Sequence, residues 1–218
     1  MAPPAPRIAL IHALSHSVAP INEELQRAWP EAVRMNLLDD SLSADLARNG
    51  KGLDEAMHRR FESLTAYAEG TGAQAILFTC SAFGPCIEAA AARRPHMPVL
   101  KPNEAMVADA VALGGRVGLI ASFGPTLESM PPEFPLGTEL VTRLAAGALE
   151  ALNEGDVQTH DAKVVEAARW LAEQGCDVIA LAQFSMARAQ MAVHRAVDLP
   201  VLTTPGSAVR MLRLRLAA

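Results

Sequence analysis

Residues 7–14, RIALIHAL, and residues 116–123, RVGLIASF, are two versions of one segment. Each begins with an arginine and continues as a short apolar run, and the two arginines lie 109 positions apart. Short, continuous apolar runs of this kind are typical of parallel strands that are covered on both faces. The pair therefore predicts two equivalent buried strands, far apart in the chain.

Two further pairs of segments follow in the same order. GAQAILFTC at 72–80 resembles GCDVIALAQ at 175–183, at a spacing of 103. The tripeptide Pro-Val-Leu at 98–100 returns at 200–202, at a spacing of 102. Because three ordered matches keep a nearly constant spacing, they indicate a duplicated unit of about 100 residues.

Longer helical patterns separate these strands, at 54–70, 104–113 and 158–174. Strands that alternate with helices are typical of βαβ units and of an α/β fold. We therefore expect two lobes related by a pseudo-twofold axis, with the active site in the cleft between them. Each lobe is expected to be a mainly four-stranded parallel sheet flanked by helices. The expected N-terminal lobe is 1–102 plus 205–218, and the expected C-terminal lobe is 103–204.

The composition argues against several classes of protein. The chain has 218 residues, of which 50% are hydrophobic, and its formal net charge of −5 argues against a nucleic-acid or membrane surface. No apolar run reaches the roughly 18 residues of a membrane span, and no signal-peptide core is found, so a cytoplasmic protein is expected. No glycine-rich phosphate loop is present, and no nucleotide cofactor is expected.

The three cysteines, Cys80, Cys86 and Cys176, are too few and too scattered for a disulfide framework or a zinc site. Cys80 follows an apolar strand and precedes SAFGP, whose proline suits the start of a helix. Unpaired backbone N–H groups and the positive end of a helix dipole favour a thiolate there. We therefore expect the pKa of Cys80 to lie below its free value of about 8.5. Cys86 and Cys176 are interpreted as packing residues.

A cysteine followed by small or hydroxylic residues, after an apolar strand, resembles the signature of the aspartate/glutamate/hydantoin racemase superfamily. This superfamily also includes maleate isomerases and arylmalonate decarboxylases, and the resemblance runs from Arg7 to the C-terminal helix. It implies that Cys80 takes the catalytic position of the N-terminal lobe, with Ser81 and Ala82 beside the substrate, and that no cofactor takes part. In the racemases one cysteine removes the proton from the α-carbon, and a second cysteine returns a proton to the opposite face of that carbon.

The second lobe departs from that pattern, because Gln183 stands where the racemases have their second cysteine. An amide donates and accepts hydrogen bonds, but it is neither an acid nor a base near neutral pH. We therefore expect one-sided chemistry at Cys80, with Gln183, Phe184 and Ser185 among the substrate contacts. Ser185 has an alternative role as the cap of a helix that begins at Met186.

Other polar residues lie at the predicted carboxyl ends of strands, where open α/β sheets bind ligands. By residue type, His12 is the best second proton carrier. Ser15, Ser122 and Thr126 complete the expected substrate contacts, although Thr126 could instead cap a helix. His12 and His16 are not expected to bind a metal, because their spacing requires a helix where a strand end is predicted.

These features predict a cofactor-independent isomerase of the racemase type, or a related decarboxylase. It would act through Cys80 at the carbon next to the carboxylate of a small acid. Racemisation, isomerisation with Cys80 as nucleophile, and decarboxylation with Cys80 as proton donor stay open. The alternative is a non-catalytic protein of the same fold that binds a small carboxylate, which the amide of Gln183 would suit. The resemblance also leads us to expect a homodimer.

Overall fold

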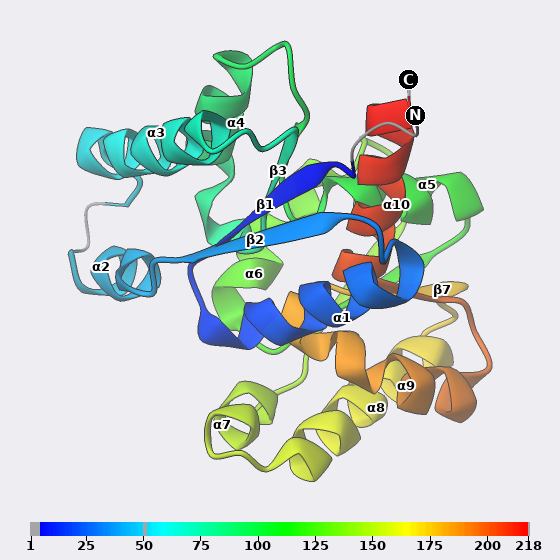
Figure 1. The fold of residues 1–218 in the computed structure, drawn as a ribbon. Helices are drawn as coiled ribbons and strands as arrows, with labels where there is room; N and C mark the ends of the chain where they lie inside the picture. Colours follow the sequence, from blue (N-terminus) through cyan, green and yellow to red (C-terminus); the bar gives the residue numbers. More distant parts are fainter. Residues whose placement is uncertain (1–4, 50–51, 218) are drawn as a thin grey trace. The chain divides into compact units, whose positions relative to one another are not determined.

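The computed structural model describes residues 5–49 and 52–217, and the chain divides into two compact units (Figure 1). The first unit comprises Met1–Pro102 with Ala208–Ala218, and the second comprises Asn103–Ser207. The C-terminal helix α10, Thr204–Ala217, begins in the second unit and ends in the first. Each unit is built around its own parallel sheet.

The sheet of the first unit has four parallel strands in the order β2-β1-β3-β4. The strands are β1 Arg7–His12, β2 Val33–Leu38, β3 Ala75–Phe78 and β4 Val99–Leu100. The central strands β1 and β3 correspond to the predicted apolar runs, and β3 is buried at every residue. The edge strand β2 is at least partly exposed along its whole length.

Helices cover both faces of this sheet. They are α1 Val18–Ala28, α2 Ser41–Asn49, α3 Glu55–Gly70 and α4 Gly84–Ala92, with the short 3-10 helices η1 Ser15–Ser17 and η2 Ser81–Phe83. Figure 1 shows α1 on one side of β1 and β2, and α3 with α4 on the other. This follows from right-handed crossovers, because the chain moves outward from β1 to β2 and then back across the sheet. On the second face the ring of Phe61 stacks on Phe78 and packs against Phe83, with centroids 5.2 and 5.0 Å apart.

The second unit repeats this architecture, with four parallel strands in the order β6-β5-β7-β8. The strands are β5 Val117–Ala121, β6 Leu140–Leu144, β7 Val178–Leu181 and β8 Val201–Thr203. The helices are α5 Glu104–Leu113, α6 Gly124–Ser129, α7 Ala148–Asn153, α8 Val157–Glu173 and α9 Gln190–Val197, with η3 Pro131–Glu133 and η4 Phe184–Ala189. The apolar face of α8 shares one buried core with β5 and β7.

The two sheets correspond to each other residue by residue. Ile11 of β1 pairs with Phe78 of β3, and Ile120 of β5 pairs with Leu181 of β7. These pairs are related by the spacings of 109 and 103 that relate the sequence repeats. The prediction of two four-stranded parallel sheets flanked by helices is therefore confirmed.

Two local predictions about helix ends are wrong. The helix after β7 begins as a 3-10 helix at Phe184, so Ser185 lies inside η4 and does not cap it. The helix after β5 begins at Gly124 with Phe123 at its N-cap position, so Thr126 lies inside α6. In both cases the helix begins before the hydroxyl residue that was expected to cap it. Across the described residues, no helix is both long and apolar enough to cross a membrane.

Candidate active site

Cys80 lies two residues beyond β3, at the carboxyl edge of the first sheet. It occupies the N-cap position of η2 with an extended backbone (φ −127°, ψ 122°), so the chain leaves the strand and turns immediately after the thiol. Its side chain is half-buried, whereas Cys86 is 1% and Cys176 4% exposed. Of the three thiols, Cys80 is therefore the most accessible to a ligand.

The surroundings of the Cys80 sulfur make it a weaker acid than a free cysteine thiol. Burial raises the pKa of the thiol, while the Ala82 backbone N–H and the Ser43 hydroxyl lower it by smaller amounts. The direction is opposite to the one expected from the sequence, because loss of hydration outweighs both polar neighbours. Near neutral pH, Cys80 is thus a protonated thiol that can donate its proton.

His12, the last residue of β1, is buried, and both of its ring nitrogens are hydrogen-bonded. Nδ1 lies 2.8 Å from Thr79 Oγ1, and Nε2 lies 3.0 Å from Asn36 Oδ1. The Asn22 amide nitrogen donates both to the Val18 carbonyl oxygen and to Asn36 Oδ1, at 2.7 and 2.8 Å. These bonds orient both amides, so Asn36 presents an acceptor to His12. The His12 proton therefore lies on Nε2, and Nδ1 accepts from Thr79.

This network holds His12 as a neutral ring. Burial lowers its pKa, and the hydrogen bond to Asn36 opposes that effect without reversing it. In this arrangement neither ring nitrogen faces a ligand. The contact with Thr79 instead joins the end of β1 to the residue that precedes Cys80. The predicted role of His12 as a second proton carrier stays a prediction.

Gln183 has the place in the second sheet that Cys80 has in the first. It lies two residues beyond β7, at the N-cap position of η4, and its backbone is also extended (φ −133°, ψ 144°). Its Oε1 accepts hydrogen bonds from the backbone N–H and the hydroxyl of Ser122, at 2.6 and 2.9 Å. Because a backbone N–H can only donate, this contact directs the NH₂ group of Gln183 away from Ser122. Both donors of Ser122 are therefore used to hold Gln183.

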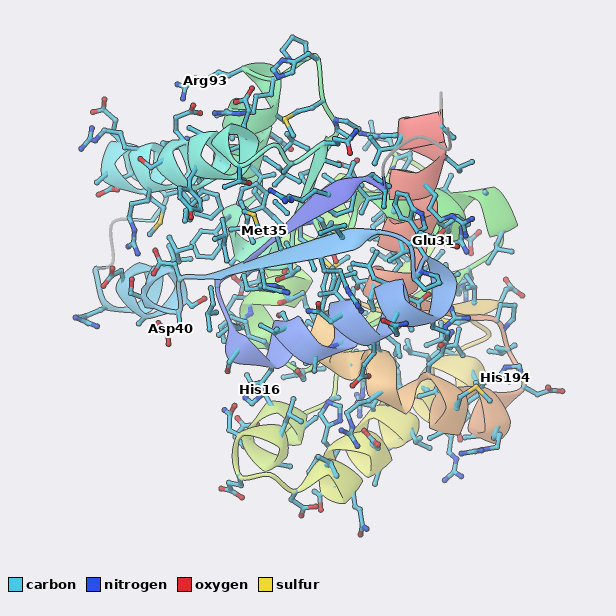
Figure 2. All side chains as sticks on the ribbon, viewed as in Figure 1. His16, Glu31, Met35, Asp40, Arg93 and His194 are labelled. Atoms are coloured by element: carbon cyan, nitrogen blue, oxygen red, sulfur yellow. The ribbon has the colours of Figure 1, made fainter. Side chains whose placement is uncertain are left out.

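The other predicted contact residues differ in exposure. Ser15 is exposed, and its neighbour His16 in η1 is half-buried (Figure 2). Ser81 and Ala82 of η2 are half-buried beside Cys80. The buried members of the predicted contact set are Ser122, Thr126, Phe184 and Ser185. Ser43 is a neighbour of the thiol that the sequence analysis missed, although a hydroxyl shortly after the carboxyl end of β2 is a recognisable signal.

The sequence model of the Asp/Glu/hydantoin racemase family matches residues 15–212. The chain belongs to this family. The match confirms the resemblance predicted from the sequence and the enzyme class that it implies, since racemases are isomerases. Among curated proteins, no sequence matches the chain.

Solved structures of racemases share the fold. A glutamate racemase isoform from Bacillus anthracis is 13% identical, with a TM-score of 0.73 over 99% of this chain and 83% of that one. An allantoin racemase from Klebsiella pneumoniae is 20% identical, with a TM-score of 0.70 over 98% and 88%. An aspartate racemase homologue from Pyrococcus horikoshii is 15% identical, with a TM-score of 0.71 over 97% and 99%. On this racemase fold, the present chain carries a thiol at the end of β3 and an amide at the end of β7.

Proposed function

We propose that this racemase-family member is a cofactor-independent enzyme that transfers a proton at the carbon next to the carboxylate of a small acid. Cys80 is the one proton-transferring thiol. The observation that carries the proposal is the matched register of the two sheets, in which Cys80 and Gln183 occupy equivalent strand ends. One lobe thus offers an acid–base group at this position, and the other offers an amide.

The protonation state of Cys80 supports a role as proton donor. Because burial raises its pKa, the resting thiol is protonated near neutral pH, and it can donate its proton to the carbanion or enolate that loss of carbon dioxide leaves. In proton exchange the thiolate form of Cys80 removes the α-hydrogen as a proton, the resulting S–H exchanges its hydrogen with solvent, and the same sulfur returns a proton to the carbon. Each of these transfers occurs on the face of the carbon that the sulfur approaches, so a single thiol exchanges the proton without inverting the carbon.

We assign hydrogen bonding, and not proton transfer, to the other polar groups. The NH₂ group of Gln183, whose oxygen is held by Ser122, suits a carboxylate or the negative charge that develops on it. The Ser81 hydroxyl and the Ala82 N–H suit the same task beside Cys80. His12 supports the end of β3 through Thr79. Ser15, Thr126, Phe184 and Ser185, the homodimer and the cytoplasmic location stay predictions.

Solvent exchange tests the proposal. The protein is incubated in deuterated water with a panel of small acids, namely aspartate, glutamate, hydantoins and 2-aryl carboxylates, and loss of the α-hydrogen is followed by proton NMR. We expect exchange on at least one of these acids, with loss in Cys80→Ser and retention in Cys176→Ser, because Cys176 is a buried packing residue. Exchange that survives in Cys80→Ser contradicts the proposal, and tight binding without exchange supports a non-catalytic carboxylate-binding protein.

A further inference from the structure

Two large apolar side chains are exposed at the carboxyl edge of the second sheet, next to the contact between Ser122 and Gln183. Phe123 is 45% exposed, and Leu144 is 40% exposed. Leu144 ends β6 and pairs with Ala121 of β5. Phe123 follows Ala121 by two residues, with Ser122 between them. Because Ser122 holds the oxygen of the Gln183 amide, at 2.6 and 2.9 Å, that amide lies beside apolar surface within one unit.

The first unit exposes an equivalent pair of apolar side chains. Leu38 ends β2 and pairs with His12, and Leu14 lies two residues after His12. Leu14 is 40% and Leu38 48% exposed, and Leu14 corresponds to Phe123 at the repeat spacing of 109. A single exposed leucine is ordinary on a protein surface. A pair that recurs at both sheet edges, where open α/β sheets bind ligands, indicates a surface that a ligand covers.

The residues directly after each strand of the second sheet carry no charge. They are SFG at 122–124, AAG at 145–147, AQF at 182–184 and TPG at 204–206. In the first unit, by contrast, Asp39, Asp40 and Lys101 directly follow β2 and β4. Lys163 of α8 does reach this edge of the second unit, because a Cβ added at Gly147 would lie 3.1 Å from its Nζ. A cation suits the carboxylate that each proposed substrate carries, and the loops themselves suit an uncharged group.

We propose that Phe123 and Leu144 bind an apolar side chain of the substrate acid and determine the specificity of the candidate active site. This inference rests on the proposed function, in which Gln183 binds the carboxylate. The substrate class is then an acid with an aryl or branched alkyl group on the reacting carbon. Aspartate and glutamate are disfavoured, because their second carboxylate would lose water against apolar side chains. Contact of the substrate's apolar group with Phe123 and Leu144 supplies binding free energy instead.

The test compares three acids, 2-phenylpropionate, propionate and aspartate, by NMR titration of the full-length protein. We expect 2-phenylpropionate to bind about tenfold more tightly than either of the others. Phe123→Ser should weaken its binding about tenfold and Leu144→Ser about fivefold, for lost apolar contacts of about 50 and about 40 Å², and both should leave propionate binding unchanged. Leu136→Ser is the matched control. Leu136 is a fully exposed leucine of the same unit that precedes β6, at the opposite edge of the sheet, and its loss should change no dissociation constant.

Phe123→Leu keeps an apolar side chain and is expected to keep the preference for 2-phenylpropionate. The inference is overturned if 2-phenylpropionate binds no more tightly than propionate or aspartate, or if Phe123→Ser weakens the binding of 2-phenylpropionate and propionate equally. It is also overturned if Phe123→Ser keeps the native preference but changes the association state in analytical ultracentrifugation, because the apolar pair then contacts a second copy of the chain. The titration requires no turnover, so its failure is distinct from an absence of Cys80-dependent exchange.

Discussion

Replacing Gln183 by cysteine restores the paired thiols of the racemases and carries a cost in stability that follows from the structure. The backbone N–H of Ser122 loses its acceptor, and Ser122 is only 6% exposed. A buried donor without a partner costs about 1–3 kcal/mol. The Ser122 hydroxyl can turn to another acceptor, so its lost bond adds little. A total of about 2 kcal/mol corresponds to a Tm lower by about 4–8 °C for a chain of this size.

Thermal unfolding followed by circular dichroism measures this difference in Tm. Gln158→Cys is the matched control, because Gln158 is an exposed residue in the first turn of α8 in the same unit. A change of this kind at an exposed position alters the free energy of unfolding by about 0.5 kcal/mol or less. If Gln183→Cys unfolds at the same temperature as Gln158→Cys, the Ser122–Gln183 contact contributes nothing, and our account of how the amide is oriented fails.

Four further outcomes are expected. His12→Leu should lower the free energy of unfolding by about 1–3 kcal/mol at about pH 8, because two buried hydrogen bonds are lost while their partners keep others. Below about pH 6.5 a histidine in the unfolded chain gains a proton, whereas His12 in the folded protein, whose pKa is lowered, does not. The free energy of unfolding should therefore decrease as the pH falls through this range, and it should decrease less in His12→Leu. Urea unfolding midpoints measure both trends. Iodoacetamide should label Cys80 before Cys86 and Cys176, because only the Cys80 side chain is partly exposed; equal labelling contradicts this order. Arg94→Met should lower the free energy of unfolding by about 2–3 kcal/mol, measured in urea. This is less than a broken, fully buried ion pair usually costs, because the two glutamate partners of Arg94 stay partly hydrated. An unchanged urea midpoint contradicts this prediction.

The sequence identifies the central strands because burial on both faces leaves a continuous apolar run. β1, β3, β5 and β7 are recognised in this way, and their repetition is enough to predict two sheets. The edge strands β2 and β6 are not placed by the sequence. Their residues, VRMNLL and LVTRL, are partly exposed and mix polar with apolar side chains, so neither an apolar run nor a strict alternation marks them.

The candidate site is only partly predictable, because its properties depend on residues distant in the sequence. The thiol at Cys80 and the amide at Gln183 follow from the repeat alone. The pKa direction of Cys80 does not, because it depends on how deeply the side chain is buried and on Ser43, which comes from another segment. The hydrogen bonds of His12 to Asn36 and Thr79 likewise span 24 and 67 positions, beyond the reach of any local pattern.

The configuration of the exchanged product tests the central claim most directly. An enantiomerically pure acid that exchanges its α-hydrogen is recovered from deuterated water, and its deuterium content and its configuration are measured on the same sample by mass spectrometry and chiral chromatography. With one thiol at Cys80 and an amide at Gln183, we predict deuterium at the α-carbon with the original configuration retained, because Gln183 cannot supply a proton to the opposite face. Cys80-dependent inversion at the rate of exchange would show that another residue delivers the second proton, and would contradict the one-sided mechanism.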